Sequence, residues 1–252
     1  LDMRAPPVPA LLVVFATLLT VPFFLQAWLR DKRPPIALGF HGRNWNASFV
    51  WALVGVLSSA PLLILEIIGT GRWDLAPAAL MGVAIGLPIF ALQGGSEEVI
   101  CRGWMMQTIG ARHGALIALI ASSIFFALLH VDPRETPLGM VVAVVARLPL
   151  AFGLGLLALR QGNLWGCFGL HAGWNAGQFG VVSFVSQVQG KDPWNELLAE
   201  NHVTRMTDVL SVDFIATLVC MLVQFAIIWL VSRQARAKLF APASAERVEA
   251  SF

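Results

Sequence analysis

The chain has 252 residues, of which 57% are hydrophobic and 13% are charged, and its mean hydropathy is +0.73. These values lie outside the range of soluble domains, so the composition predicts a polytopic membrane protein. The net charge of +2 comes from basic residues scattered over short loops, with no continuous basic stripe, which excludes nucleic acid as a partner.

Apolar runs predict about seven transmembrane helices, each of roughly 20 residues to match about 30 Å of hydrocarbon. The expected fold class is therefore all-α, a polytopic transmembrane helix bundle. In chain order, the expected spans cover residues 8–29, 47–68, 77–93, 115–129, 138–159, 164–185 and 212–231. The first run is too long for the core of a secretory signal, so we expect it to be retained as a span.

The basic residues in the short connections predict the orientation of these spans. The side that receives most of them carries Arg30, Lys32, Arg33, Arg43, Arg112, Arg160, Arg233, Arg236, Lys238 and Arg247. Because the richer side is cytoplasmic, we expect the N-terminus outside and the C-terminus in the cytoplasm.

Polar residues follow the third apolar run, in the segment QGGSEE of residues 93–98. An ionisable side chain within a span is costly in lipid unless it faces the bundle interior or water, so it is a functional candidate. The two glycines predict a break in the helix, with Ser96 as the N-cap of a new helix that runs to Ile109. Glu97 and Glu98 then fall in its first turn, where the helix dipole favours carboxylates.

Four polar side chains are expected at overlapping depth. At 1.5 Å per residue, Glu97 lies about 18 Å from the turn that ends its helix, and His130 lies about 25 Å from the same turn on the returning helix. His171 and Asn175 lie about 12 and 18 Å from the connection at residues 160–163. We therefore expect the four groups to meet inside the bilayer.

Spacing within the helices supports this convergence. His171 and Asn175 stand at i and i+4, so both project to one side of their helix. Glu98 and Arg102 have the same spacing, which allows an ion pair on one face. Phe126 lies one turn before His130 and is expected to pack beneath its ring. Glycines that would let a neighbouring helix approach closely are Gly166, Gly169, Gly173 and Gly177.

Other polar residues in the spans are expected to be interhelical or interfacial contacts instead of catalysts. These residues are Glu66, Arg147, Asp213 and Gln224. A lone histidine or asparagine in a span also often bridges two helices, so each candidate alone is a weak signal. The tryptophans near predicted span ends, which fit an aromatic belt, are Trp28, Trp45, Trp73 and Trp229.

Taken together, three segments resemble the CAAX-protease and bacteriocin-processing family of intramembrane peptidases, whose eukaryotic relatives trim prenylated CaaX proteins. The elements that carry the resemblance are Glu97-Glu98-xxx-Arg102, Phe126-xxx-His130 and His171-xxx-Asn175. They stand in the family's order and with its inner spacing, and the resemblance covers roughly residues 87–184.

The resemblance implies a role for each matching residue. Glu97 would be the general base, and His130 would help to hold and polarise the attacking water. His171 and Asn175 would stabilise the oxyanion of the tetrahedral intermediate. Three further residues would support the site, namely Glu98, Arg102 and Phe126.

Metal dependence is left as an alternative. Glu97, His130 and His171 form a possible three-ligand zinc site with a free position for water. No HExxH motif is present, and Asn175 is a poor zinc ligand but a good oxyanion donor, so a metal-free glutamate peptidase is favoured. We expect no cofactor, with Zn2+ as the second possibility.

The expected function is that of an intramembrane endopeptidase that cleaves a membrane-associated protein or peptide, with the lipid bilayer as its other partner. Residues 1–76 would form N-terminal helices without motifs, residues 77–186 the catalytic core, and residues 187–252 an extramembrane loop, the last helix and a basic tail. Such a compact chain is expected in a prokaryotic plasma membrane.

Two other functions compete with this interpretation. A non-catalytic immunity or regulatory protein could use the same fold, since resemblance alone does not show cleavage. A proton or solute transporter ranks last, because transporters of this kind usually break helices in both halves, and only one break is predicted here.

Overall fold

The computed structural model describes residues 8–29, 32, 38–42, 44–131, 136–199, 212–234 and 239, which contain helices and turns but no strand. In chain order, the elements are α1 (Val8–Leu29), η2 (Asn44–Asn46), α2 (Ala47–Thr70), η3 (Trp73–Leu75), α3 (Ala76–Glu98), the π-helix η4 (Val99–Met106), α4 (Gln107–His113), α5 (Ala115–Leu128), α6 (Pro137–Gln161), α7 (Trp165–Gln189), α8 (Pro193–Ala199) and α10 (Val212–Val231). Each predicted apolar run coincides with one of these helices, so the all-α fold class is confirmed.

Four helical segments among the described residues are long and apolar enough to cross a membrane. They are Asn44–Thr70, Trp73–His113, Pro137–Gln161 and Phe214–Val231. Large apolar side chains are exposed on their outer faces, such as Leu53 on α2 and Leu80 on α3, as expected where lipid replaces water. These features indicate an integral membrane protein, while the number of about seven spans stays a prediction. Residues 200–211 of the predicted extramembrane loop and nearly all of the basic C-terminal tail lie outside the described residues.

The helix break predicted at residues 94 and 95 is wrong. The chain stays helical from Ala76 through η4 to His113, and the turn comes at Gly114, where φ is 84°. Ser96 lies inside the helix, and its hydroxyl donates a hydrogen bond to the carbonyl of Gln93 at 2.6 Å instead of capping a helix start. The glycine pair permits close packing of α7, since a Cβ at either position would crowd an aromatic ring of that helix.

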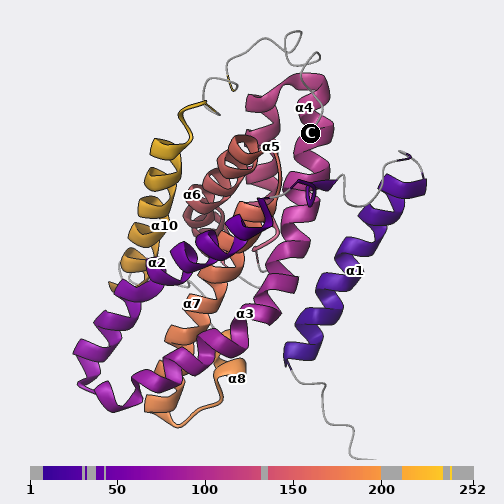
Figure 1. The fold of residues 1–252 in the computed structure, drawn as a ribbon. Coiled ribbons are helices and arrows are strands. Elements are labelled where there is room, and N and C mark those ends of the chain that lie inside the picture. Colours follow the sequence, from indigo (N-terminus) through magenta and orange to yellow (C-terminus); the bar gives the residue numbers. More distant parts are fainter. Residues whose placement is uncertain are drawn as a thin grey trace, which may run out of the picture.

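α7 is the central helix, with α2 on one side and α3 on the other. Figure 1 shows α1 along one flank of this group and α10 along the opposite flank. The expected close approach on α7 is confirmed for Gly169, Gly173 and Gly177, since a Cβ at any of them would overlap α2. Gly166 instead makes room for the side chain of Gln161. The backbone of α7 is thus held firmly against α2.

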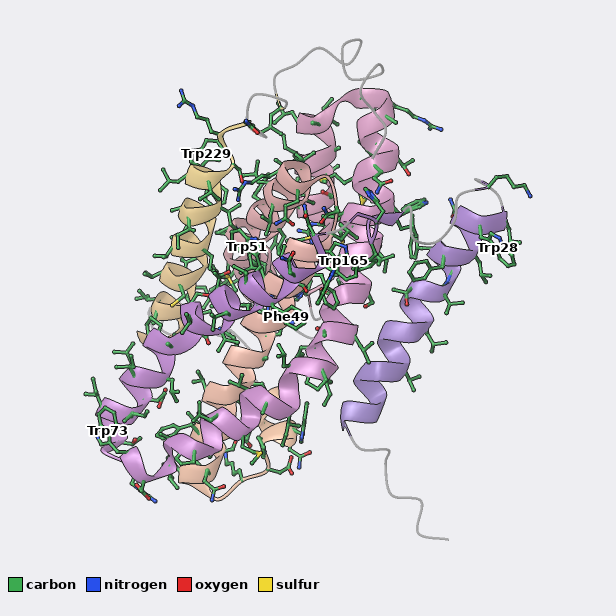
Figure 2. The ribbon with its side chains drawn as sticks, viewed as in Figure 1. Trp28, Phe49, Trp51, Trp73, Trp165 and Trp229 are labelled. Atoms are coloured by element: carbon green, nitrogen blue, oxygen red, sulfur yellow. The ribbon has the colours of Figure 1, made fainter. Side chains whose placement is uncertain are left out.

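Side chains at the outer parts of the bundle follow the sequence-based expectations. Gln224 of α10 donates a hydrogen bond to the Ser58 hydroxyl of α2 at 2.5 Å, so it is an interhelical contact as predicted. The side chain of Asp213 lies outside the described residues. Figure 2 shows Trp73 at one end of the bundle and Trp229 toward the opposite end. The aromatic belt itself stays a prediction.

Candidate active site

Two adjacent glutamates at the end of α3 form the centre of a buried polar cluster. The side chain of Glu97 is 9% exposed and that of Glu98 is fully buried. Because neighbouring residues of a helix point about 100° apart, the two carboxylates point in different directions. Glu97 faces the imidazoles of two other segments, whereas Glu98 faces a guanidinium.

Both histidines of the predicted site lie beside Glu97. Its Oε2 atom is 3.8 Å from Nε2 of His130, which follows α5, and 3.8 Å from Nε2 of His171 on α7. The same oxygen is buried and makes no hydrogen bond to the described residues. Three helical segments thus bring one carboxylate oxygen and two ring nitrogens together around a single point.

The other nitrogen of each ring determines what the Nε2 atoms can do. Nδ1 of His130 lies 2.9 Å from the carbonyl oxygen of Phe126, and Nδ1 of His171 lies 2.9 Å from Oε1 of Glu98. Both partners are acceptors, so each Nδ1 carries the proton and the Nε2 of a neutral ring is an acceptor. Oε2 of Glu97 and the two Nε2 atoms are therefore all acceptors without a donor between them. A water molecule, which has two O–H groups, could donate to two of them.

Arg102 neutralises the second glutamate. Its Nη1 atom lies 2.8 Å from Oε1 of Glu98, and its Nη2 donates to the carbonyl of Ala151 on α6 at 2.7 Å. The guanidinium also stacks over the ring of Phe126, 4.6 Å from its centroid. A buried ion pair with further hydrogen bonds of this kind is tolerated in an apolar interior.

Phe126 packs the aromatic part of the cluster together. Its ring centroid lies 4.7 Å from that of His130 and 5.5 Å from that of His171. The ring is 1% exposed, so it fills the space beneath both imidazoles. Its position one turn before His130 matches the packing expected from the sequence.

Asn175 reaches the cluster through a residue that the sequence analysis did not single out. Its Nδ2 donates to Oε1 of Gln93 at 3.0 Å, and Nε2 of Gln93 donates in turn to Oε1 of Glu97. Gln93 stands one helical turn before Glu97. An amide at that spacing inside an apolar run was the sequence feature that could have identified it as a site residue. Asn175 therefore connects to Glu97 through an intervening amide, and one of its own N–H groups remains for another acceptor.

The donor atoms around Glu97 lie slightly farther apart than the ligands of one zinc ion do. Tetrahedral ligands with bonds of about 2.1 Å lie roughly 3.4 Å apart, whereas both Nε2 atoms lie 3.8 Å from Oε2 of Glu97. The described part of the chain likewise contains no group of three His, Cys, Asp or Glu side chains arranged to hold a metal ion.

An apolar cavity of about 310 Å3 lies between α1, η4, α4 and α5. The residues that line it are Phe23, Ile100, Trp104, Met105, Thr108, Ile109 and Phe125. None of them belongs to the polar cluster, although Phe125 adjoins Phe126 in α5. The cavity is therefore separate from the polar cluster.

Comparison with known proteins gives one match. Residues 79–177 match the family model described as Rce1-like, the type II CAAX prenyl endopeptidases. The matched range begins in α3 and ends in α7, and it includes every residue of the polar cluster. No curated protein and no solved structure matches the chain.

Proposed function

We propose that this chain hydrolyses a peptide bond of a membrane-associated protein or peptide. It carries an Rce1-like CAAX endopeptidase domain in residues 79–177 and so belongs to that family of proteases. One observation carries the proposal, namely that Oε2 of Glu97 lies 3.8 Å from Nε2 of both His130 and His171. Three acceptors around one point are a binding site for the water that hydrolysis consumes.

Glu97 acts as the general base in this scheme. The water donates one O–H to Oε2 of Glu97 and the other to Nε2 of His130, which orients its lone pair toward the substrate carbonyl. As the new C–O bond forms, the proton passes to Glu97 and the carbonyl oxygen becomes an oxyanion. When the C–N bond breaks, Glu97 returns that proton to the leaving nitrogen, so the products are a carboxylic acid and an amine.

His171 and Asn175 are placed to stabilise the oxyanion. The Asn175 amide has an N–H group beyond the one given to Gln93. His171 donates from Nε2 when its ring carries a second proton, and the Glu98 carboxylate 2.9 Å from Nδ1 compensates that charge. Donors aimed at such an oxyanion contribute about 3 to 4 kcal/mol each to catalysis.

The depth of Glu97 supports cleavage within the membrane. The helical segment Trp73–His113 has 41 residues and is therefore about 60 Å long, roughly twice the thickness of the hydrocarbon layer. Glu97 lies far from both of its ends, and its side chain is 9% exposed, so a peptide must enter the bundle to reach it. Residues 77–186 would form the catalytic core, in a prokaryotic plasma membrane with the N-terminus outside.

Cleavage by the purified full chain in detergent tests the proposal. Farnesylated CaaX peptides and an unprenylated peptide library are incubated with wild type, Glu97→Gln and Glu196→Gln. Glu196 is a matched control, because it lies on α8 in a surface pair with Lys191. We expect Glu97→Gln to lose at least 100-fold in kcat, in line with the usual loss on removing a general base, while Glu196→Gln retains wild-type rates.

Two results would contradict the proposal. Equal cleavage by wild type and Glu97→Gln would remove Glu97 from the mechanism. The other is that wild type cleaves none of the peptides while its cellular effect survives the substitutions Glu97→Gln and His130→Ala. That result would support a non-catalytic immunity or regulatory protein.

A further inference from the structure

A second cation lies deep in the bundle, at Arg147 on α6. This helix is a candidate membrane span, Pro137–Gln161, and Arg147 stands about 15 Å along it from Pro137. A guanidinium at such depth is costly unless it faces a polar interior. Arg160, the other charged residue of α6, is exposed in the last turn, so only Arg147 calls for a partner inside the bundle.

The register of α5 and α6 places Arg147 beside the reactive groups. Phe126 of α5 and Ala151 of α6 contact the same residue, Arg102, so they lie at one level of the bundle. One turn beyond Phe126, just past the end of α5, is His130, and one turn back in the antiparallel α6 is Arg147. Arg147 therefore lies at the level of His130, whose ring faces Glu97.

Electrostatics gives the same placement. The charge of Arg147 interacts with Glu97 and with His130, although no ion pair with Glu97 is formed. Nη1 of Arg147 donates to the carbonyl of Ala143 at 3.2 Å, so the side chain extends back toward the start of α6. This is the one hydrogen bond that the guanidinium makes to the described residues. A guanidinium has five N–H donors, so the others remain for a further acceptor.

Building on the proposed function, we infer that Arg147 binds a carboxylate of the substrate close to the scissile bond. Arg147 lies at the level of His130, and its side chain extends toward the Ala143 carbonyl one turn nearer the start of α6. An extended peptide advances about 3.3 Å per residue. The carboxylate would therefore belong to a residue within a few positions of the bond that is cut. Arg147 would pair with it through the two-pronged geometry that guanidinium groups favour, and would screen it from Glu97.

The substrate's C-terminal carboxylate and an acidic side chain share this chemistry, so the test separates them. Three versions of one farnesylated CaaX peptide are used: the free acid, the C-terminal amide, and the amide with Asp in the last position. KM and kcat are measured for wild type, Arg147→Gln, Arg147→Lys and Arg160→Gln. Binding of the same peptides is measured on Glu97→Gln and on the double variant Glu97→Gln/Arg147→Gln, where cleavage plays no part.

We expect a carboxylate peptide to have a KM and Kd at least about tenfold below those of the plain amide, as for a charge-assisted hydrogen bond. Arg147→Gln removes this preference mainly through KM, Arg147→Lys keeps part of it, and Arg160→Gln keeps all of it. The preferred peptide identifies the source of the carboxylate. A purely structural role for Arg147 would shift all three peptides equally.

Retention of the carboxylate preference in Arg147→Gln would overturn the inference, as would equal binding of all three peptides to Glu97→Gln. These outcomes are independent of the proposed function, because binding is read on a variant that lacks Glu97. Full activity of Glu97→Gln would contradict the proposed mechanism while leaving the binding result for Arg147 valid.

Discussion

Nδ1 of His171 lies 2.9 Å from Oε1 of Glu98, and this carboxylate joins helices that are far apart in the sequence. The same oxygen accepts a hydrogen bond from Arg102 at 2.8 Å. Glu98 thus holds the imidazole in the orientation that presents Nε2 to Glu97. A partner on the second nitrogen fixes both the tautomer and the direction of a histidine ring.

Replacing Glu98 should therefore affect both stability and activity. Glu98→Gln leaves the buried Arg102 without its counter-charge, which typically costs about 3 to 5 kcal/mol, and it weakens the orientation of His171. We expect a clear drop in the thermal unfolding temperature in detergent and a strong loss of cleavage. The double variant Glu98→Leu/Arg102→Leu removes both charges and should recover much of the stability without recovering activity. Recovery of activity in the double variant would show that Glu98 does not orient His171.

Gln93 is expected to matter for activity more than for stability. Its amide donates to Glu97 and accepts from Asn175, so Gln93→Leu frees both groups from their relative positions. We expect cleavage to fall about tenfold or more, since loss of one hydrogen bond to a charged group is worth about 1.5 to 3 kcal/mol. Gln178→Leu is the matched control, because Nε2 of Gln178 on α7 has no hydrogen-bond partner among the described residues.

The coupling between Gln93 and Asn175 provides a further check. If they act as one unit, the double variant Gln93→Leu/Asn175→Ala loses little more activity than the worse single variant. Additive losses would mean that the two amides act separately, and Asn175 would then be placed by other contacts.

Hydropathy located the helices well because the cost of burying polar groups in lipid acts on each segment separately. The prediction of a helix break at residues 94 and 95 was wrong. Glycines can end a helix or allow another helix to pack closely, and here the outcome depends on His171 and Phe168 of a distant segment. Gln93 was missed because an amide carries no charge to mark it inside an apolar run. The pairing of Glu98 with His171 also depends on how α3 and α7 pack, which spacing within one helix does not reveal.

Glycines at the α7 interfaces should tolerate no side chain. A Cβ at Gly173 would overlap the backbone of Ala52, and a Cβ at Gly94 would lie 3.1 Å from the ring of His171. We expect Gly173→Ala to destabilise the protein by about 1 to 3 kcal/mol, as overpacking does. Gly94→Ala should displace His171 and reduce cleavage with a smaller change in stability.

Gly110 provides the control for these substitutions. It lies in α4, where a Cβ would make an ordinary contact of 3.6 Å with Ala118. Gly110→Ala should leave stability unchanged or raise it by about 0.5 to 1 kcal/mol, because alanine favours a helix. If Gly173→Ala were as stable as Gly110→Ala in thermal unfolding, the close contact between α2 and α7 would not be a determinant of this fold.

Removing metal ions should leave cleavage intact. The Nε2 atoms of His130 and His171 lie 3.8 Å from Oε2 of Glu97, wider than the roughly 3.4 Å that ligands of one zinc ion allow. A water molecule whose hydrogen bonds are about 2.8 Å long can still bridge this spacing, with an angle of roughly 85° between its two partners. We therefore expect protein dialysed against a strong chelator to contain well under one metal ion per chain by elemental analysis and to keep its rate. The prediction is contradicted if the purified protein contains stoichiometric zinc and if activity is lost on chelation and restored by zinc alone. Glu97, His130 and His171 would then be zinc ligands, and the three side chains would have to draw closer together around the ion.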